Sequence, residues 1–98
     1  MSLAFTKRLR EPIMRGETTC TVRIWRSLRV KVGGRYPLGP GHVHVTRIQH
    51  IGLADVTDEI ARRSGFHDLD DLLSVARHGS GESVYLIDFV YRGEAGPQ

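Results

Sequence analysis

The fold is decided by the stretch from residue 18 to residue 25, which reads Thr-Thr-Cys-Thr-Val-Arg-Ile-Trp. Its β-branched residues favour a strand, and the side chains of a strand alternate between two faces. One face is apolar and carries Cys20, Val22 and Ile24. The other face has side chains that can hydrogen bond, pair with a phosphate or stack, namely Thr19, Thr21, Arg23 and Trp25. This strand is therefore predicted to separate a core from a chemically equipped surface.

Three further runs complete the predicted sheet. Residues 83–91 are apolar on both faces, as expected of a central strand, and residues 42–49 alternate between polar and apolar side chains. A short strand around Tyr36 follows the turn predicted at residues 33–34. We expect one core to contain Cys20, Val22, Ile24, Val84, Leu86 and Phe89.

The remaining segments are predicted to be one short strand and three helices. A short strand at residues 3–5 is expected to precede a helix that ends at Gly16, with an irregularity at Pro12. After residue 52, Asp55 or Thr57 can cap a helix that stops at Gly65. Asp68 can cap a second helix that continues to Gly79. The pattern predicts an α+β fold in which short helices pack at one side of a small curled sheet or barrel.

Composition sets limits on the class of protein. The 98 residues suit one domain, expected over residues 1–92, followed by a polar tail at residues 93–98. No run approaches the ~20 apolar residues of a membrane-spanning helix, so no membrane partner is expected. Cys20 is the single cysteine, which excludes an intramolecular disulfide and favours a cytoplasmic location. The sequence indicates no cofactor.

Charge is distributed unevenly along the chain. The first 50 residues contain ten basic and two acidic side chains, a net charge of +8, whereas the remainder contains four basic and nine acidic ones, a net charge of −5. Such a division indicates a basic face that attracts phosphate groups, unless the two halves simply neutralise each other.

Four segments resemble the ASCH family. Residues 13–23 resemble its signature, in which a helix ends in Gly and a strand follows with the pattern x-Lys-Thr-x-Thr-x-Arg. Residues 31–34 resemble the family's Lys-x-Gly-Asp turn, residues 53–66 its helix ending Glu-Gly-Phe, and residues 84–89 its closing strand. The resemblance covers nearly the whole chain and implies a PUA-like β-barrel with a cleft beside the signature strand. It also implies binding of RNA or modified bases, or removal of acyl groups from N4 of cytidine.

The enzymatic branch of the family implies three catalytic positions. Thr21 matches the nucleophile, but Thr18 stands where the family has Lys and Ser64 stands where it has a catalytic Glu. A threonine hydroxyl is a weak nucleophile without a base, so both roles would have to pass to other groups, such as Lys7 or Glu59. We therefore expect binding without catalysis.

Other residues suggest binding more than catalysis. His42 and His44 share one face of a strand, but no third metal ligand is evident, and we predict no metal site. Trp25 could stack on a base or pack against a helix. Arg23 could hold a phosphate or base edge, or form an ion pair with Asp88 or Glu17.

The sequence predicts a basic cleft that binds RNA or a modified nucleobase. Thr19, Thr21, Arg23 and Trp25 would line it, and phosphate capture would involve Lys7, Arg8, Arg26, Arg29, Lys31 and Arg35. Two alternatives stay open. One is a small hydrolase that resembles an N4-acylcytidine amidohydrolase or a ribonuclease, and the other is a protein-interaction module. The identity of the base, the choice of RNA over DNA and the oligomeric state also stay open.

Overall fold

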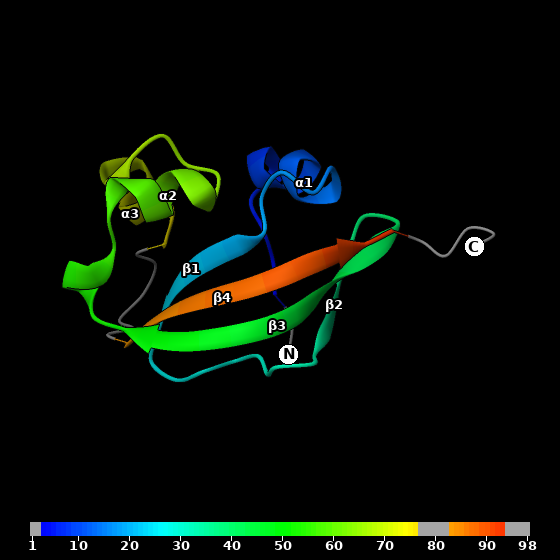
Figure 1. Ribbon diagram of the computed structural model, residues 1–98, viewed down its shortest axis with the longest axis horizontal. Coiled ribbons are helices and arrows are strands. Elements are labelled where there is room, and N and C mark those ends of the chain that lie inside the picture. Colours follow the sequence, from blue (N-terminus) through cyan, green and yellow to red (C-terminus); the bar gives the residue numbers. More distant parts are fainter. Residues whose placement is uncertain (1–2, 77–82, 94–98) are drawn as a thin grey trace.

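A computed structural model of the protein describes residues 3–76 and 83–93. The elements in chain order are α1 (Lys7–Met14), β1 (Cys20–Trp25), β2 (Arg35–Leu38), β3 (Gly41–Ile51), the single-turn helix η1 (Leu53–Asp55), α2 (Asp58–Arg63), α3 (Leu69–Ala76) and β4 (Ser83–Arg92). The four strands form one antiparallel sheet, and the three α-helices gather along one side of it (Figure 1). None of the helices in this part of the chain has the length and apolar character needed to cross a bilayer.

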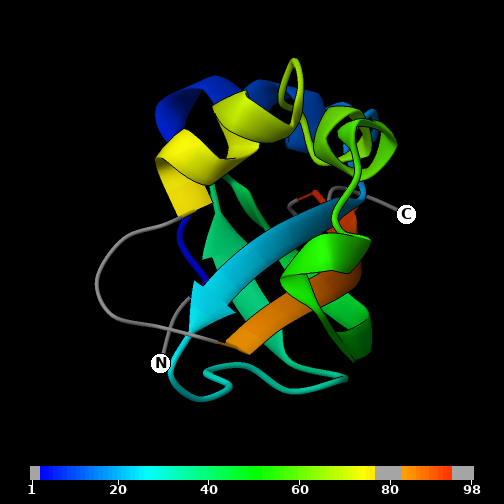
Figure 2. The ribbon, with the colours of Figure 1, turned by 90° about the vertical axis from the view of Figure 1, so that its left-hand side faces the viewer.

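The sheet curls into an open half-barrel. Its strand order is β1-β4-β3-β2, so β1 and β2 lie at the two edges (Figure 1). Figure 2 shows the strands twisting across one another beneath the helices. The predicted α+β class, with short helices on one side of a small curled sheet, is confirmed.

The core occupies both faces of the sheet. All six residues predicted for it are buried, with exposures from 1% for Cys20 to 7% for Ile24 and Leu86. Strand register places Val22 opposite Leu86, on the face that also carries Cys20 and Ile24. The other face buries Phe89, which meets the ring of Phe5 edge-on with 5.6 Å between centroids.

The first apolar segment differs from the prediction. Residues 3–5 form no strand, although Leu3 and Phe5 are both buried. A run of apolar residues indicates that a segment is buried, but it does not specify a strand. Here the side chains pack against the sheet, and the backbone does not pair with a described strand. Pro12 lies inside α1, which nevertheless runs over eight residues from Lys7.

The predicted helix signals operate in the structure. The Thr57 hydroxyl accepts a hydrogen bond of 3.2 Å from the backbone N–H of Ile60, as an N-cap does. Gly65 follows α2 with φ at +99°, a conformation that favours glycine. The Asp68 carboxylate accepts a hydrogen bond from the backbone N–H of Asp71 at 2.9 Å. The predicted end at Gly79 lies outside the described residues.

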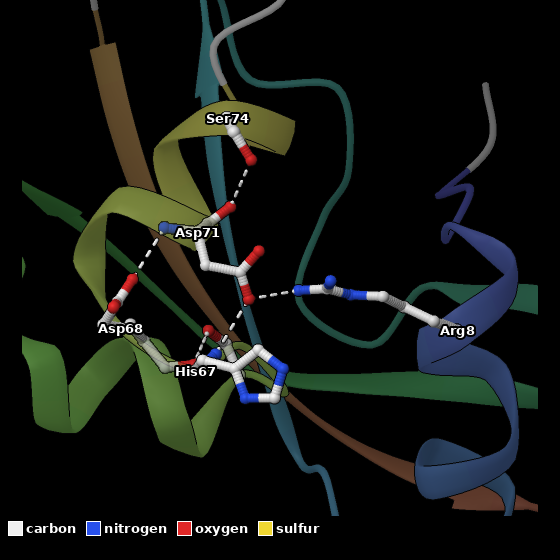
Figure 3. Close-up of polar contacts among 7 residues, drawn as sticks. Arg8, His67, Asp68, Asp71 and Ser74 are labelled. Carbon is white, nitrogen blue, oxygen red and sulfur yellow. Dashed lines mark hydrogen bonds and ion pairs between the residues drawn. The ribbon is translucent and has the colours of Figure 1, made fainter.

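An ion pair joins the first helix to the third. Arg8 of α1 pairs with the Asp71 carboxylate of α3, which also accepts a hydrogen bond from the backbone N–H of His67 at 2.9 Å (Figure 3). The His67 hydrogen bond and the Arg8 guanidinium lower the pKa of Asp71. Arg8 also lies 4.8 Å from the centroid of the Phe66 ring. These contacts fix Phe66 and α3 relative to α1.

Candidate functional site

A cleft of about 270 Å³ lies beside β1. Its apolar wall comes from the helical side of the molecule and consists of Leu9, Phe66, Val75 and Ala76. Its opposite wall comes from β1 and the loop that follows, with Thr21, Arg23, Trp25 and Arg29. Ala4 and Thr6 of the N-terminal segment, together with Val22 and Ile24 of β1, complete the described lining. The cleft is therefore apolar on one side and carries two guanidinium groups on the other.

The free edge of β1 also faces the cleft. The backbone N–H of Phe89 donates to the carbonyl of Thr19 at 3.0 Å, so Thr19 and Phe89 form a hydrogen-bonded pair of the β1–β4 ladder. In an antiparallel ladder every second pair of residues is hydrogen bonded. Val22 and Ile24 fall between the bonded pairs, and their N–H and C=O groups point away from β4. Both residues line the cleft. A ligand there can meet backbone donors and acceptors that no described strand uses.

Arg23 is the most constrained polar group in the cleft. Its Nε donates to the Thr21 hydroxyl at 3.1 Å, and its Nη2 donates to the carbonyl of Ala4 at 2.5 Å. The guanidinium lies 5.0 Å from the centroid of the Phe5 ring. Burial lowers the pKa of Arg23 to about 10, so the group stays charged at neutral pH.

Neither Glu17 nor Asp88, the two acids considered from the sequence as partners of Arg23, forms an ion pair with it. Glu17 instead forms an ion pair with Arg15, with 2.9 Å between Glu17 Oε2 and Arg15 Nε. Asp88 lies on the opposite face of the sheet from Arg23. Within residues 3–76 and 83–93, no carboxylate lies within 4.0 Å of Arg23. A half-buried cation held only by neutral acceptors and a ring is suited to receive an anionic ligand.

Trp25 and Arg29 form the outer part of the cleft. The guanidinium of Arg29 lies 5.9 Å from the Trp25 ring centroid, at the outer limit of a cation–π contact. Trp25 is half-buried, so part of its ring stays accessible. Tyr85 of β4 lies next to Trp25, with 6.1 Å between the two ring centroids.

Thr21 has no described base beside it. Its side chain is buried, and its hydroxyl accepts the hydrogen bond from Arg23. Thr18 and Ser64 are also buried, but neither lines the cleft, and the Ser64 hydroxyl donates a hydrogen bond to the carbonyl of Ala61. Lys7 and Glu59 are exposed and lie outside the lining. No described lining residue carries a carboxylate, an imidazole or an amine.

The structure brings together four of the residues predicted to bind a ligand. These are Thr21, Arg23, Trp25 and Arg29. The remaining predicted residues are exposed and lie outside the cleft lining: Lys7, Arg8, Thr19, Arg26, Lys31 and Arg35. Sequence reasoning missed the apolar wall, although the segment ending at Phe66 was singled out. It also missed the free edge at Val22 and Ile24, because strand order is not visible in a sequence.

The three histidines of β3 lie on two faces of the sheet. Strand register places His42 opposite Arg92 and His44 opposite Val90, whereas His50 lies opposite Tyr85. A register shift between Val45 and Arg47 inserts one extra residue and exchanges the faces. Among the residues with described positions, no three metal-ligating side chains gather.

Comparison with known proteins returned no match, since no protein-family model, curated protein or solved structure matches this chain.

Proposed function

We propose that the cleft beside β1 binds RNA or a modified nucleobase, in a domain of the ASCH type with a PUA-like arrangement of its sheet. The observation that carries the proposal is the Arg23 guanidinium, half-buried next to Trp25 with no carboxylate partner in the described part of the chain. Charges taken out of water are normally paired, and a nucleotide phosphate would supply the missing anion.

The lining suits the parts of a nucleotide. A base can stack on Trp25, which is a sequence-tolerant contact because every base has a π-face. The N–H and C=O groups of Val22 and Ile24, which no described strand pairs with, can hydrogen bond to a base edge. Arg29, held only weakly over Trp25, can turn toward a phosphate.

The same lining favours binding over hydrolysis. Acyl transfer by a threonine needs a base in contact with its hydroxyl, and the hydroxyl of Thr21 instead accepts a hydrogen bond from Arg23 Nε. The described lining supplies no group that could take the Thr21 proton. Hydrolysis is therefore a weaker proposal than binding for this cleft.

Fluorescence of Trp25, the single tryptophan, provides a direct test. Cytidine 5′-monophosphate, adenosine 5′-monophosphate and N4-acetylcytidine are titrated at low salt, and stacking is expected to quench the emission. Arg23→Met should weaken binding of the two monophosphates by about 10-fold or more, because a charge-assisted contact is lost. Circular dichroism and thermal melting check that the variant stays folded.

Arg35→Met is the matched control. Arg35 is exposed on β2 and lies outside the cleft lining, so its replacement should leave the quenching unchanged. The proposal fails if none of the three ligands quenches Trp25, or if Arg23→Met and Arg35→Met weaken binding equally.

A further inference from the structure

Three aromatic rings form a row across β1, β4 and β3. The ring centroids of Trp25 and Tyr85 are 6.1 Å apart, and those of Tyr85 and His50 are 5.0 Å apart. Tyr85 and His50 are stacked, with an angle of 25° between their planes, whereas Trp25 is tilted by 43°. We refer to Trp25, Tyr85 and His50 as the aromatic row.

Strand register explains why the three rings share one face. Tyr85 lies directly opposite Arg23 on one side and directly opposite His50 on the other. Trp25 is two residues from Arg23 on β1, so it projects from the same face. The aromatic row is thus continuous with the cleft, because Trp25 belongs to both.

The aromatic row is at least partly accessible to a ligand. Trp25 and Tyr85 are half-buried, and His50 is exposed. On this face Ser83 lies opposite Trp25 and Ile48 lies opposite Ile87, so these strand pairings place no carboxylate there. The nearby cations are Arg23 and Arg29, which complements a phosphate backbone.

We propose that the aromatic row extends the cleft into a path for a single strand of nucleic acid at least two nucleotides long. One base enters the cleft against Trp25, and the next base lies on Tyr85 and His50. The inference rests on the proposed function of the cleft and specifies its ligand as a strand in place of an isolated nucleoside. Aromatic side chains on a sheet face are a general means of holding unpaired bases, which stack on successive rings.

Ligand length is the variable that tests this path. Trp25 emission is titrated with cytidine 5′-monophosphate, then with the dinucleotide and trinucleotide of cytidine, in both ribose and deoxyribose series. The dinucleotide should bind at least ~5-fold and up to ~150-fold more tightly than the monophosphate, the range expected for one base stacked on an aromatic ring. A gain in either series supports the path, and comparison of the two series identifies the sugar that it accepts.

Variants separate the aromatic row from the cleft. Tyr85→Leu and His50→Ala should each remove much of the gain from the second nucleotide, while binding of the monophosphate changes by less than about 2-fold. Tyr85→Phe keeps the ring and should keep the gain. His44→Ala removes a histidine of the same strand that projects from the opposite face, and it should have no effect. His50 is exposed, so its variant tests the path even if Tyr85→Leu loses stability.

The two proposals can fail separately. If the monophosphate binds and the dinucleotide binds no more tightly, the path is wrong and the cleft proposal stands. If the gain survives both Tyr85→Leu and His50→Ala, the aromatic row is not its source and the path is likewise wrong. If no ligand of either series quenches Trp25, both proposals fail.

Discussion

The guanidinium of Arg23 lies over the ring of Phe5, 5.0 Å from its centroid, across a separation of 18 residues. The same guanidinium donates to the carbonyl of Ala4, so one side chain of β1 holds the N-terminal segment against the sheet. That segment supplies Ala4 and Thr6 to the cleft lining. Arg23 is therefore both a structural anchor and the charge that a ligand would meet.

Salt dependence should report the number of phosphate contacts. For single strands, the logarithm of the affinity falls by ~0.7 for each decade of salt and each contact, so Arg23 and Arg29 together predict a slope of about 1.4 for a short oligonucleotide. Arg29→Met should lower the slope by ~0.7. Trp25 quenching measured over a series of potassium chloride concentrations gives both values.

Arg35→Met is the control for this series as well. It removes a positive charge of the same kind outside the cleft, and the slope should stay as in the natural protein. Affinity that is independent of salt would contradict phosphate binding at Arg23 and Arg29.

N4-acetylcytidine should remain intact during long incubation with the protein. The Thr21 hydroxyl accepts a hydrogen bond from Arg23 Nε, and no described lining residue can act as a base toward the Thr21 hydroxyl proton. Chromatography of the nucleoside after incubation measures the outcome. Release of cytidine by the natural protein, abolished in Thr21→Val, would show that the cleft is catalytic and that another group serves as the base.

The stability of the protein should depend on alkaline pH through Cys20. Burial raises the pKa of the Cys20 thiol to about 11 from an ordinary value of 9.0, with Arg63 opposing the shift and Asp88 adding to it. The unfolded thiol loses its proton first, so this contribution to stability is complete below pH 9 and is lost as the pH rises toward 11. Between about pH 8 and pH 10 the loss should be on the order of 1 kcal/mol.

Denaturant unfolding of the natural protein and of Cys20→Ala over this pH range checks the expectation. The variant should show the shallower decline, since the thiol is absent. Burial lowers the pKa of Arg23 to about 10, so above that pH the folded protein loses the Arg23 proton before the unfolded chain does. This titration makes stability rise with pH, opposite to the effect of Cys20. This is why the comparison is limited to pH values up to about 10. Equal pH dependence in the two proteins would show that Cys20 titrates normally.

Local patterns in the sequence determine most of the elements and much of the core. Alternation in residues 20–25 correctly separates buried Cys20 and Val22 from half-buried Arg23 and Trp25. The cap at Thr57 and the stop at Gly65 are likewise local, because each depends on one side chain or one backbone conformation. Thr21 is the exception on its face, since it is buried beside Arg23.

Tertiary structure alone decides how these elements build the site. The place of β1 at the edge of the described sheet leaves the outward backbone groups of Val22 and Ile24 without a partner strand among the described residues, and strand order depends on pairings between residues far apart in sequence. In the sequence nothing distinguishes Arg8 from the other basic side chains of the first half of the chain. Its ion pair with Asp71 forms only because α3 packs beside α1. The extra residue between Val45 and Arg47 turns His50 toward Tyr85 and leaves His44 on the other face, because the side-chain period of a strand is two and a single insertion inverts it.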